Sequence, residues 1–306
     1  MSVSATISCG LRSRRRFRAL AASALALAWL TVGYGAHAQE KALLWKVSKD
    51  AHSLYLLGSI HYLRKEHFPL HRSILETFEA SKRLVLEIDL NSISPEVAQR
   101  ATLEKAIYRD GSTLEQNVDP ETYQLTAQAA EKLGLEIKRL APMKPWFAAL
   151  TLVALKLQRL GLEPGLGVDR YLAERARGAG KPTRGWESLE FPLALFDRLP
   201  RLDQQALLRE TVGQMNRLDA DIDQIVQSWT RGDSDRLETL LLAGMKEFPE
   251  LHERVIVERN RRWVSQIEKM IAQGGGALVV VGAAHLVGKN GIVEMLKARG
   301  YRMEQV

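Results

Sequence analysis

Ala277-Leu278-Val279-Val280-Val281 is a continuous apolar run that leads directly into Gly282-Ala283-Ala284-His285. A Val/Leu run of this length is typical of a strand that is buried on both faces, as in a parallel sheet. A second run, Leu54-Tyr55-Leu56-Leu57, leads into Gly58-Ser59-Ile60-His61 in the same way. Both runs are therefore predicted to be strands of one mostly parallel sheet, and each is followed by a histidine.

The rest of the chain alternates between short apolar runs and long helical patterns, which indicates the α/β class. Because the strand signals concentrate near the two ends of the chain, the sheet is predicted to be built from the N- and C-terminal parts. Three further strands are predicted from shorter apolar runs, at residues 43–47, 84–86 and 301–306.

Helical patterns dominate the middle of the chain. They predict large helical insertions at about 95–165 and 190–250, which form a cap on the sheet. Two helices are predicted to run without interruption, over 203–229 and 251–273. No low-complexity linker divides the chain, so residues 39–306 are predicted to form a single domain.

The first 38 residues have the pattern of a signal peptide: a basic region, an apolar run and the small-residue site Ala36-His37-Ala38. Cleavage there leaves a mature chain that starts at Gln39 and is exported, most simply to a bacterial periplasm. An uncleaved N-terminal anchor is the alternative. Ser13-Arg14-Arg15-Arg16-Phe17 also fits a twin-arginine signal, so the export route is either the Sec or the twin-arginine pathway.

Removing the leader changes the charge and the cysteine count. Five of the 43 basic residues are arginines of the leader, which leaves 38 basic against 36 acidic residues. So small a net charge gives no reason to expect a nucleic-acid partner. The single cysteine, Cys9, also leaves, so the mature chain has neither disulfides nor thiolate ligands. No later apolar stretch reaches the length of a membrane span, and the pattern indicates no particular oligomeric state.

Carboxylates occupy positions similar to those of the two histidines. Glu87 directly follows the run 84–86, and Glu187 follows the stretch 181–186. In open α/β sheets the carboxyl ends of parallel strands meet at one edge, where ligands bind. Two histidines and two glutamates there would suit a divalent metal such as Zn, Mn or Co. Alternatives remain for each: a structural histidine, a solvated loop for Glu87, and a helix cap for Glu187.

A charge run, Glu258-Arg259-Asn260-Arg261-Arg262, begins the last long helix. By itself such a run indicates a solvated helix face. The nucleophile motif G-x-S-x-G, the zinc motif H-E-x-x-H and the Walker A motif do not occur in the sequence. Hydrolysis by an activated water is therefore the simplest chemistry for a site of His, Glu and Arg.

Taken in order, the motifs of this chain resemble those of the TraB/GumN family. Ser59 stands where the family's first G-x-x-H motif usually has Thr, and the family's Glu motif takes the form Trp186-Glu187-Ser188. The likeness covers essentially the whole mature chain. It rests on residues 44–47, 54–61, 67–70, 167–172, 258–260 and 281–288, together with Gly291.

The resemblance implies a relation to the Tiki proteins, membrane-associated metalloproteases that clip secreted signalling proteins and need a divalent ion. More distantly it implies a likeness to the erythromycin-esterase and ChaN-like folds. Its site residues, carried over by position, are His61, Glu87, Glu187, Arg259 and His285. Asn260 is a further candidate.

On this basis the chain is expected to be a periplasmic, metal-dependent hydrolase acting on peptide bonds of a peptide or protein substrate. His61, His285 and Glu187 are expected to bind a divalent ion. Glu87 is expected to act as general base, and Arg259 to stabilise the oxyanion. The alternatives are a non-catalytic protein that binds a peptide, haem or another small ligand, and a metal-free His/Glu esterase.

Overall fold

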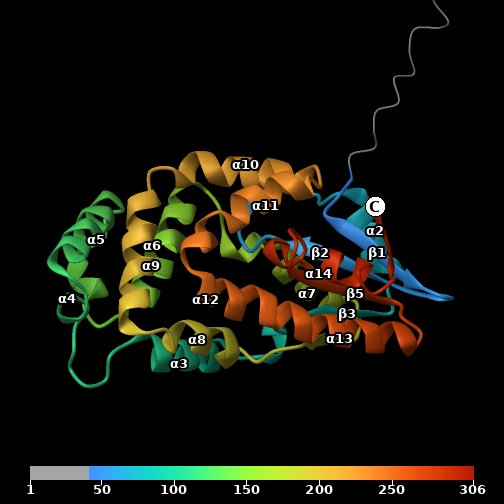
Figure 1. Cartoon of the computed structure of the whole chain (residues 1–306), viewed down its shortest axis with the longest axis horizontal. Coiled ribbons are helices and arrows are strands. Elements are labelled where there is room, and N and C mark those ends of the chain that lie inside the picture. The colour runs from blue at the N-terminus through green and yellow to red at the C-terminus, as the bar shows by residue number, and fades with distance from the viewer. Residues whose placement is uncertain (1–40) are drawn as a thin grey trace, which may run out of the picture. The chain divides into compact units, whose positions relative to one another are not determined.

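The computed structural model describes residues 41–306, apart from the side chain of Leu90, so the predicted leader lies outside the described residues. This part of the chain contains a six-stranded sheet, in the order β4-β3-β5-β2-β1-β6, with the helices α4, α5, α6 and α9 at the opposite end (Figure 1). The strands are β1 (Leu44–Lys49), β2 (His52–Ser59), β3 (Arg83–Leu86), β4 (Thr183–Gly185), β5 (Ala277–Gly282) and β6 (Arg302–Gln305).

The sheet is mostly parallel, as predicted. β5 pairs in parallel with β2 on one side and β3 on the other, and β3 pairs in parallel with β4. The register aligns Ser59 with Gly282, and Leu86 with Val280. β1 and β6 complete the sheet as antiparallel strands. The α/β class and the assembly of the sheet from both ends of the chain are confirmed, and β4 is the one strand that comes from the middle.

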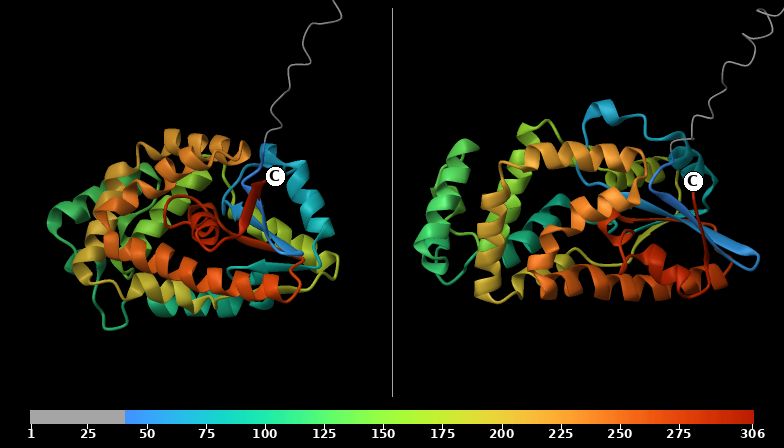
Figure 2. Two further views of the ribbon diagram at one scale, coloured as in Figure 1. Left: turned by 45° about the vertical axis from the view of Figure 1, so that its right-hand side comes forward. Right: turned by 45° about the horizontal axis from the view of Figure 1, so that its top comes forward.

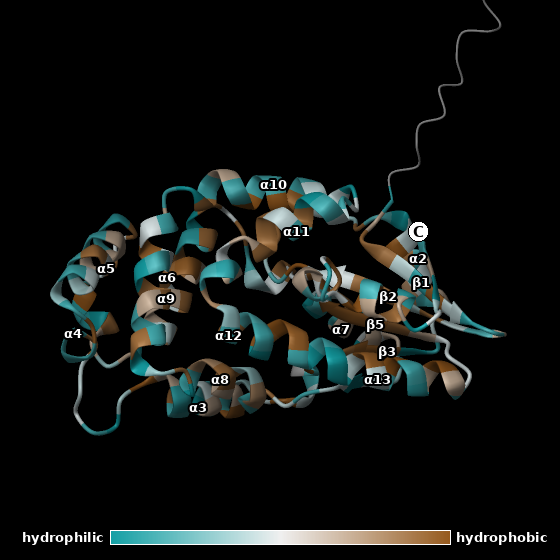
Figure 3. Ribbon diagram, in the orientation of Figure 1, coloured by the Kyte–Doolittle hydropathy of each residue, from teal (hydrophilic) through white to brown (hydrophobic). Residues whose placement is uncertain are grey.

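Strand β5 can lie in the interior of the sheet, between β3 and β2, because none of its side chains is polar and needs contact with water. Its residues from Ala277 to Val281 are each at most 1% exposed, since helices cover both faces of the sheet. Figure 3 shows the apolar colour concentrated on the central strands and alternating with polar residues along the covering helices. Around the sheet the main apolar core includes residues of α2 (Arg72–Ala80), α7 (Val168–Gly178), α13 (Glu258–Ala272) and α14 (Ile292–Lys297).

A second apolar cluster belongs to the cap. It is formed by buried residues such as Leu114, Ala130, Leu152 and Leu208, which come from helices that pack on one another beyond the carboxyl end of β2 (Figures 1 and 2). These helices fall in the two ranges predicted as insertions. The remaining α-helices are α3 (Pro95–Ala106), α4 (Leu114–Asn117), α5 (Pro120–Lys132), α6 (Pro145–Arg159), α8 (Glu190–Asp197), α9 (Arg201–Gln214), α10 (Leu218–Thr230), α11 (Ser234–Leu242) and α12 (Pro249–His252).

Of the two long helices predicted as unbroken, the first is divided, whereas the second is helical from 251 to 272 but contains a π-helical turn. The first is divided between α9 and α10 at residues 215–217, because α9 packs on α5 and α6 whereas α10 packs on α11. The second begins with α12 and passes through a π-helical turn, Glu253–Val257, before α13 starts. The helical pattern of the sequence does not by itself distinguish the division at 215–217 or the π-helical turn.

Short 3-10 turns connect several elements. They are η1 (Lys65–His67), η2 (Leu90–Ser92), η3 (Ile137–Leu140), η4 (Pro164–Leu166), η5 (Gly244–Glu247) and η7 (Ala283–His285). Within residues 41–306, no helix combines the length and the apolar character needed to cross a membrane.

Candidate active site

The four parallel strands each lead into one of the histidines or glutamates predicted for the site. His61 lies two residues after β2, Glu87 directly after β3, Glu187 two residues after β4, and His285 at the end of the turn that follows β5. Because these strands are parallel and adjacent, all four side chains reach the same edge of the sheet.

Gly282 provides the space in which three of them meet. A Cβ atom on Gly282 would lie 3.3 Å from Oε1 of Glu87, 3.7 Å from Cδ2 of His285 and 3.9 Å from Nε2 of His61. The backbone N–H of Gly282 also donates a hydrogen bond to Oε1 of Glu87 over 2.6 Å. The two histidines, 224 residues apart in the sequence, therefore lie against the same glycine, as their matching motifs predicted.

A second glycine brings the two glutamates together. A Cβ atom on Gly185 would lie only 2.6 Å from the backbone N of Asp89, so only glycine lets the chain after β4 approach the chain after β3 this closely. The backbone N–H of Glu187 then donates to the carbonyl of Glu87 over 2.8 Å. Two carboxylates placed this close together need a cation between them.

Arg259, from the first turn of α13, is that cation. Its Nε and Nη2 donate to Glu187 over 3.1 and 2.7 Å, and Nη2 also donates to Glu87 over 2.5 Å. Its Nη1 donates to Nε2 of His285 over 3.1 Å and to the carbonyl of Val255 over 3.3 Å. These contacts use the guanidinium's five N–H groups. The side chain is 6% exposed, and the facing carboxylates raise the pKa of Arg259 in spite of its desolvation.

The tautomer of His285 follows from a backbone carbonyl. The carbonyl of Asn290 can only accept, so Asn260 must donate to it through Nδ2, over 2.7 Å. Asn260 then presents Oδ1 to His285, whose Nδ1–H donates over 2.7 Å. Nε2 of His285 is left with a lone pair that accepts from Arg259. Burial lowers the pKa of His285 to about 4, which matches a neutral ring held in this tautomer.

Replacing Asn260 with leucine, which has a similar size, removes the hydrogen bonds that Asn260 makes to the carbonyl of Asn290 and to Nδ1 of His285. We expect a loss of about 1–3 kcal/mol of stability, because Nδ1 of His285, a buried residue, is left without a partner. We also expect ¹⁵N NMR of the imidazole to show a mixture of tautomers in place of the single Nδ1–H form. The control is Asn290→Ala, which keeps the backbone carbonyl. A single tautomer in Asn260→Leu would contradict this interpretation.

His61 differs from the rest of the cluster because it is open to solvent, with 61% of its side chain exposed. Its Nδ1 lies 3.2 Å from Oδ1 of Asp169, in the first turn of α7. Gly167 makes this pairing possible, since a Cβ atom there would lie 2.6 Å from the backbone oxygen of His61. The N–H of Val168 also donates to the carbonyl of Ile60 over 2.9 Å, which fixes the start of α7 against the loop after β2.

Asp169 is the site residue that sequence reasoning does not select. It belongs to the Gly167-Val168-Asp169 motif, which carries part of the family resemblance but indicates no chemistry by itself. A glycine just before an acidic residue in the first turn of a helix is the available signal, because it indicates close approach of another chain segment.

The charges around His61 and Glu87 affect their proton affinities in opposite directions. Partial desolvation lowers the pKa of His61, but the hydrogen bond to Asp169 and the charges of Asp169 and Glu87 outweigh it and raise that pKa to about 9. Burial raises the pKa of Glu87, yet the facing His285 and Arg259, together with His61 and the N–H of Gly282, hold it below its ordinary value. At neutral pH His61 is therefore mostly protonated, and Glu87 is ionised.

The predicted metal ligands, as arranged in this structure, do not fit a divalent ion. Both oxygens of Glu187 accept from Arg259, and the lone pair of Nε2 on His285 faces the same guanidinium. In the described part of the chain, no three His, Cys, Asp or Glu side chains are placed so that they could hold a metal. A bound ion would have to displace Arg259 from these donors, because two cations cannot share them.

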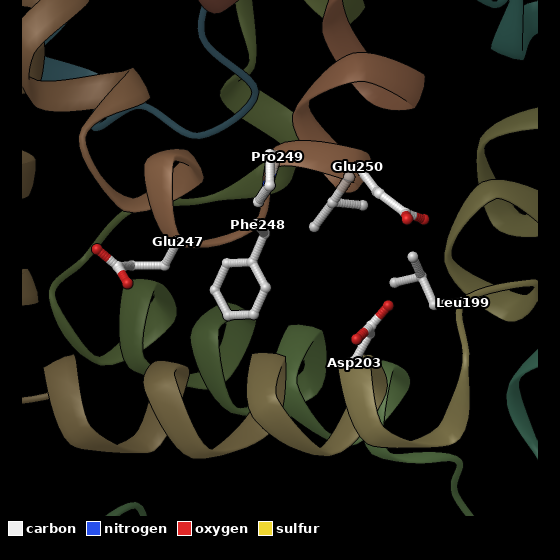
Figure 4. A pocket seen from close by; sticks show the side chains of 7 residues that line it. Leu199, Asp203, Glu247, Phe248, Pro249 and Glu250 are labelled. Carbon is white, nitrogen blue, oxygen red and sulfur yellow. The ribbon is translucent and has the colours of Figure 1, made fainter.

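The cluster is separate from the hollow drawn in Figure 4. That hollow, of about 200 Å³, lies between the start of α9 and the segment from η5 to α12. The side chains of Phe248, Leu199 and Asp203 point toward the space between them, whereas the carboxylates of Glu247 and Glu250 point outward on opposite sides. None of the predicted site residues lines it, so it takes no part in the chemistry of the cluster.

The fold and the site define an α/β protein with a His/Glu/Arg cluster at the carboxyl edge of a mostly parallel sheet. A model of the TraB/PrgY/gumN family matches residues 43–305. The chain belongs to the TraB/PrgY/gumN family, and the resemblance drawn from its motifs is confirmed.

Individual relatives match over most of their length. The chain is 24% identical over 243 residues to the uncharacterized protein YbaP of Escherichia coli (strain K12), which covers 79% of this chain and 87% of YbaP. YbaP of Shigella flexneri matches to the same extent. An uncharacterized protein of Treponema pallidum (strain Nichols) is 22% identical over 279 residues, covering 85% of this chain and 81% of that protein. No solved structure matches the chain. Because membership of a family does not specify a reaction, the function is argued from the site.

Proposed function

We propose that this protein is a hydrolase of ester or peptide bonds, in which His61 transfers the proton of the attacking water. The observation that carries the proposal is the Asp169–His61 pair, which presents the solvent-open Nε2 of His61 toward Gly282 and Glu87. An imidazole whose other nitrogen is held by a carboxylate is the arrangement that general-base hydrolysis requires. The predicted leader is the reason for proposing a periplasmic location.

The proposed reaction has two proton transfers. Neutral His61 takes a proton through Nε2 from a water molecule while the water oxygen attacks the substrate carbonyl. The tetrahedral intermediate then collapses, and protonated His61 returns the proton to the departing alkoxide or amine. Asp169 and Glu87 stabilise the imidazolium formed between these steps, because their negative charges face the ring.

This assignment changes two of the roles expected from the sequence. Glu87 is a weaker base than His61, because both its oxygens accept hydrogen bonds and its pKa is lowered. Arg259 has no N–H left for an oxyanion, so its role is to hold Glu87, Glu187 and His285 in position. The metal-dependent hydrolase expected from the sequence is the competing proposal, and it requires Arg259 to release these donors.

The proposal is tested by assaying the purified protein on p-nitrophenyl esters and fluorogenic peptides, with and without a chelator. We expect the rate to survive chelation. We also expect kcat/KM to rise from neutral pH and to level off above about 9, because the raised pKa keeps His61 protonated below that value and a general base must be neutral. Complete loss of activity in chelator, restored by Mn, Co or Zn, would support the metal-dependent alternative instead.

A further inference from the structure

A cavity of about 350 Å³ adjoins the Asp169–His61 pair. It lies where the end of β3 and turn η2 face α3 and α7. The lining is mainly apolar, from Leu86, Ile88, Ile93, Pro95, Ala98 and Ala173.

Two of the residues that line this cavity connect it with the site. Asp169 lines it and at the same time holds Nδ1 of His61 over 3.2 Å. Leu86 lines it and directly precedes Glu87. The cavity therefore borders Asp169 on the Nδ1 side of His61, while Nε2 of His61 faces Gly282. In contrast, the hollow of Figure 4 and the larger one between α9, α10 and α11 are lined by neither His61 nor Asp169.

The charges at this cavity are already paired, which determines the kind of ligand it suits. Arg170 lines it but donates to Glu174 over 3.1 Å, and Asp169 is paired with His61. A bound carboxylate would lie beside Asp169, which would repel it. The site therefore suits an uncharged apolar group.

We propose that this cavity binds an uncharged apolar substituent of the substrate, of the size of a leucine side chain or a hexanoyl chain, next to the bond that is hydrolysed. The inference rests on the proposed function for its role in catalysis, but the binding itself is measurable without turnover. Substrates that reach this cavity are preferred, because each methylene group that becomes buried strengthens binding about fourfold.

Binding is tested with hexanamide, a neutral probe, on protein with ¹³C-labelled isoleucine and alanine methyl groups. We expect hexanamide to shift the methyl signals of Ile88, Ile93 and Ala98, and acetamide to shift them much less. Ala98→Trp fills the cavity and should abolish the shifts. Gln99→Trp is the matched control, because it adds the same bulk at an exposed position of α3. Absence of the shifts in the wild type, or shifts that persist in Ala98→Trp, would overturn the inference.

Turnover distinguishes this inference from the proposed function. With p-nitrophenyl hexanoate and acetate, we expect the preference for hexanoate over acetate to fall at least about tenfold in Ala98→Trp and to stay within about twofold of the wild type in Gln99→Trp. If the probe binds in the cavity but no ester or peptide is hydrolysed, the proposed function fails and the apolar binding site stands. If hydrolysis occurs with an unchanged hexanoate preference in Ala98→Trp, the cavity is not the substrate pocket.

Discussion

Replacing Arg259 with alanine is expected to destabilise the protein by about 3–5 kcal/mol, measured by urea unfolding at neutral pH. The substitution removes the one cation between two buried carboxylates, since the side chains of Glu87 and Glu187 are only 17% and 7% exposed. It also leaves His285 without the donor that its Nε2 accepts from. The loss should therefore reflect two buried carboxylates that no longer share a guanidinium, rather than missing apolar contacts, although Arg262 still lies 3.7 Å from Glu187.

Arg261 provides the matched control. It lies two residues further along α13, is 59% exposed and pairs with Glu253, so Arg261→Ala should change stability by no more than about 0.5 kcal/mol. If Arg259→Ala and Arg261→Ala lose the same stability, the contacts of Arg259 with Glu87, Glu187 and His285 do not stabilise the protein as described.

The cost of losing Arg259 should also depend on pH. In the wild type the lowered pKa of Glu87 contributes stability that is present at neutral pH and is lost as the pH falls through that pKa. In Arg259→Ala, Glu87 keeps the burial that raises its pKa and loses the guanidinium charge that lowers it. The difference between wild type and variant should therefore narrow from neutral to acidic pH. A constant difference would contradict the electrostatic explanation.

Replacing His61 with alanine is expected to reduce kcat about 10²–10⁴-fold, because the group that accepts the proton from water is removed. At about pH 10, above the raised pKa of His61, where its charged pairing with Asp169 no longer adds stability, the unfolding free energy should change by less than about 1 kcal/mol, since 61% of the side chain is exposed. Rates on a p-nitrophenyl ester and urea unfolding curves of the same preparations provide the two readouts. His52→Ala is the control, because His52 is also exposed and starts the same strand, β2, at its opposite end. An active but unstable His61→Ala would show that the histidine is structural.

The position of the site could be predicted from the sequence because it depends on local pattern. A continuous apolar run identifies a buried strand, and the residue after it then lies at the edge of the sheet. This reasoning located His61 and His285, and it extended to Glu87 because Leu84, Val85 and Leu86 form a recognisable strand. Strand β4 is only three residues long, so its pattern is too short to predict by itself.

The family resemblance, and not the residue pattern, indicates Arg259, because a charge run by itself predicts a solvated helix face. Which side chains pair within the site could not be predicted from the sequence. Arg259 lies in a run of charged residues, of which Arg261 and Arg262 are half exposed or more, whereas Arg259 is turned inward beside a π-helical turn. The pairing of Glu187 with Arg259 depends on the close approach at Gly185, and that of His61 with Asp169 on the approach at Gly167. A single sequence does not show which glycine meets which segment.

The measurement that tests the central claim most directly is the rate of ester and peptide hydrolysis by the chelator-treated wild type and His61→Ala, side by side. We predict that the treated wild type remains active and that His61→Ala loses at least about 10²-fold under the same conditions. Equal rates for the two proteins, or a treated wild type that is inactive until a divalent metal is added, would contradict the account of His61 as the base of a metal-free site.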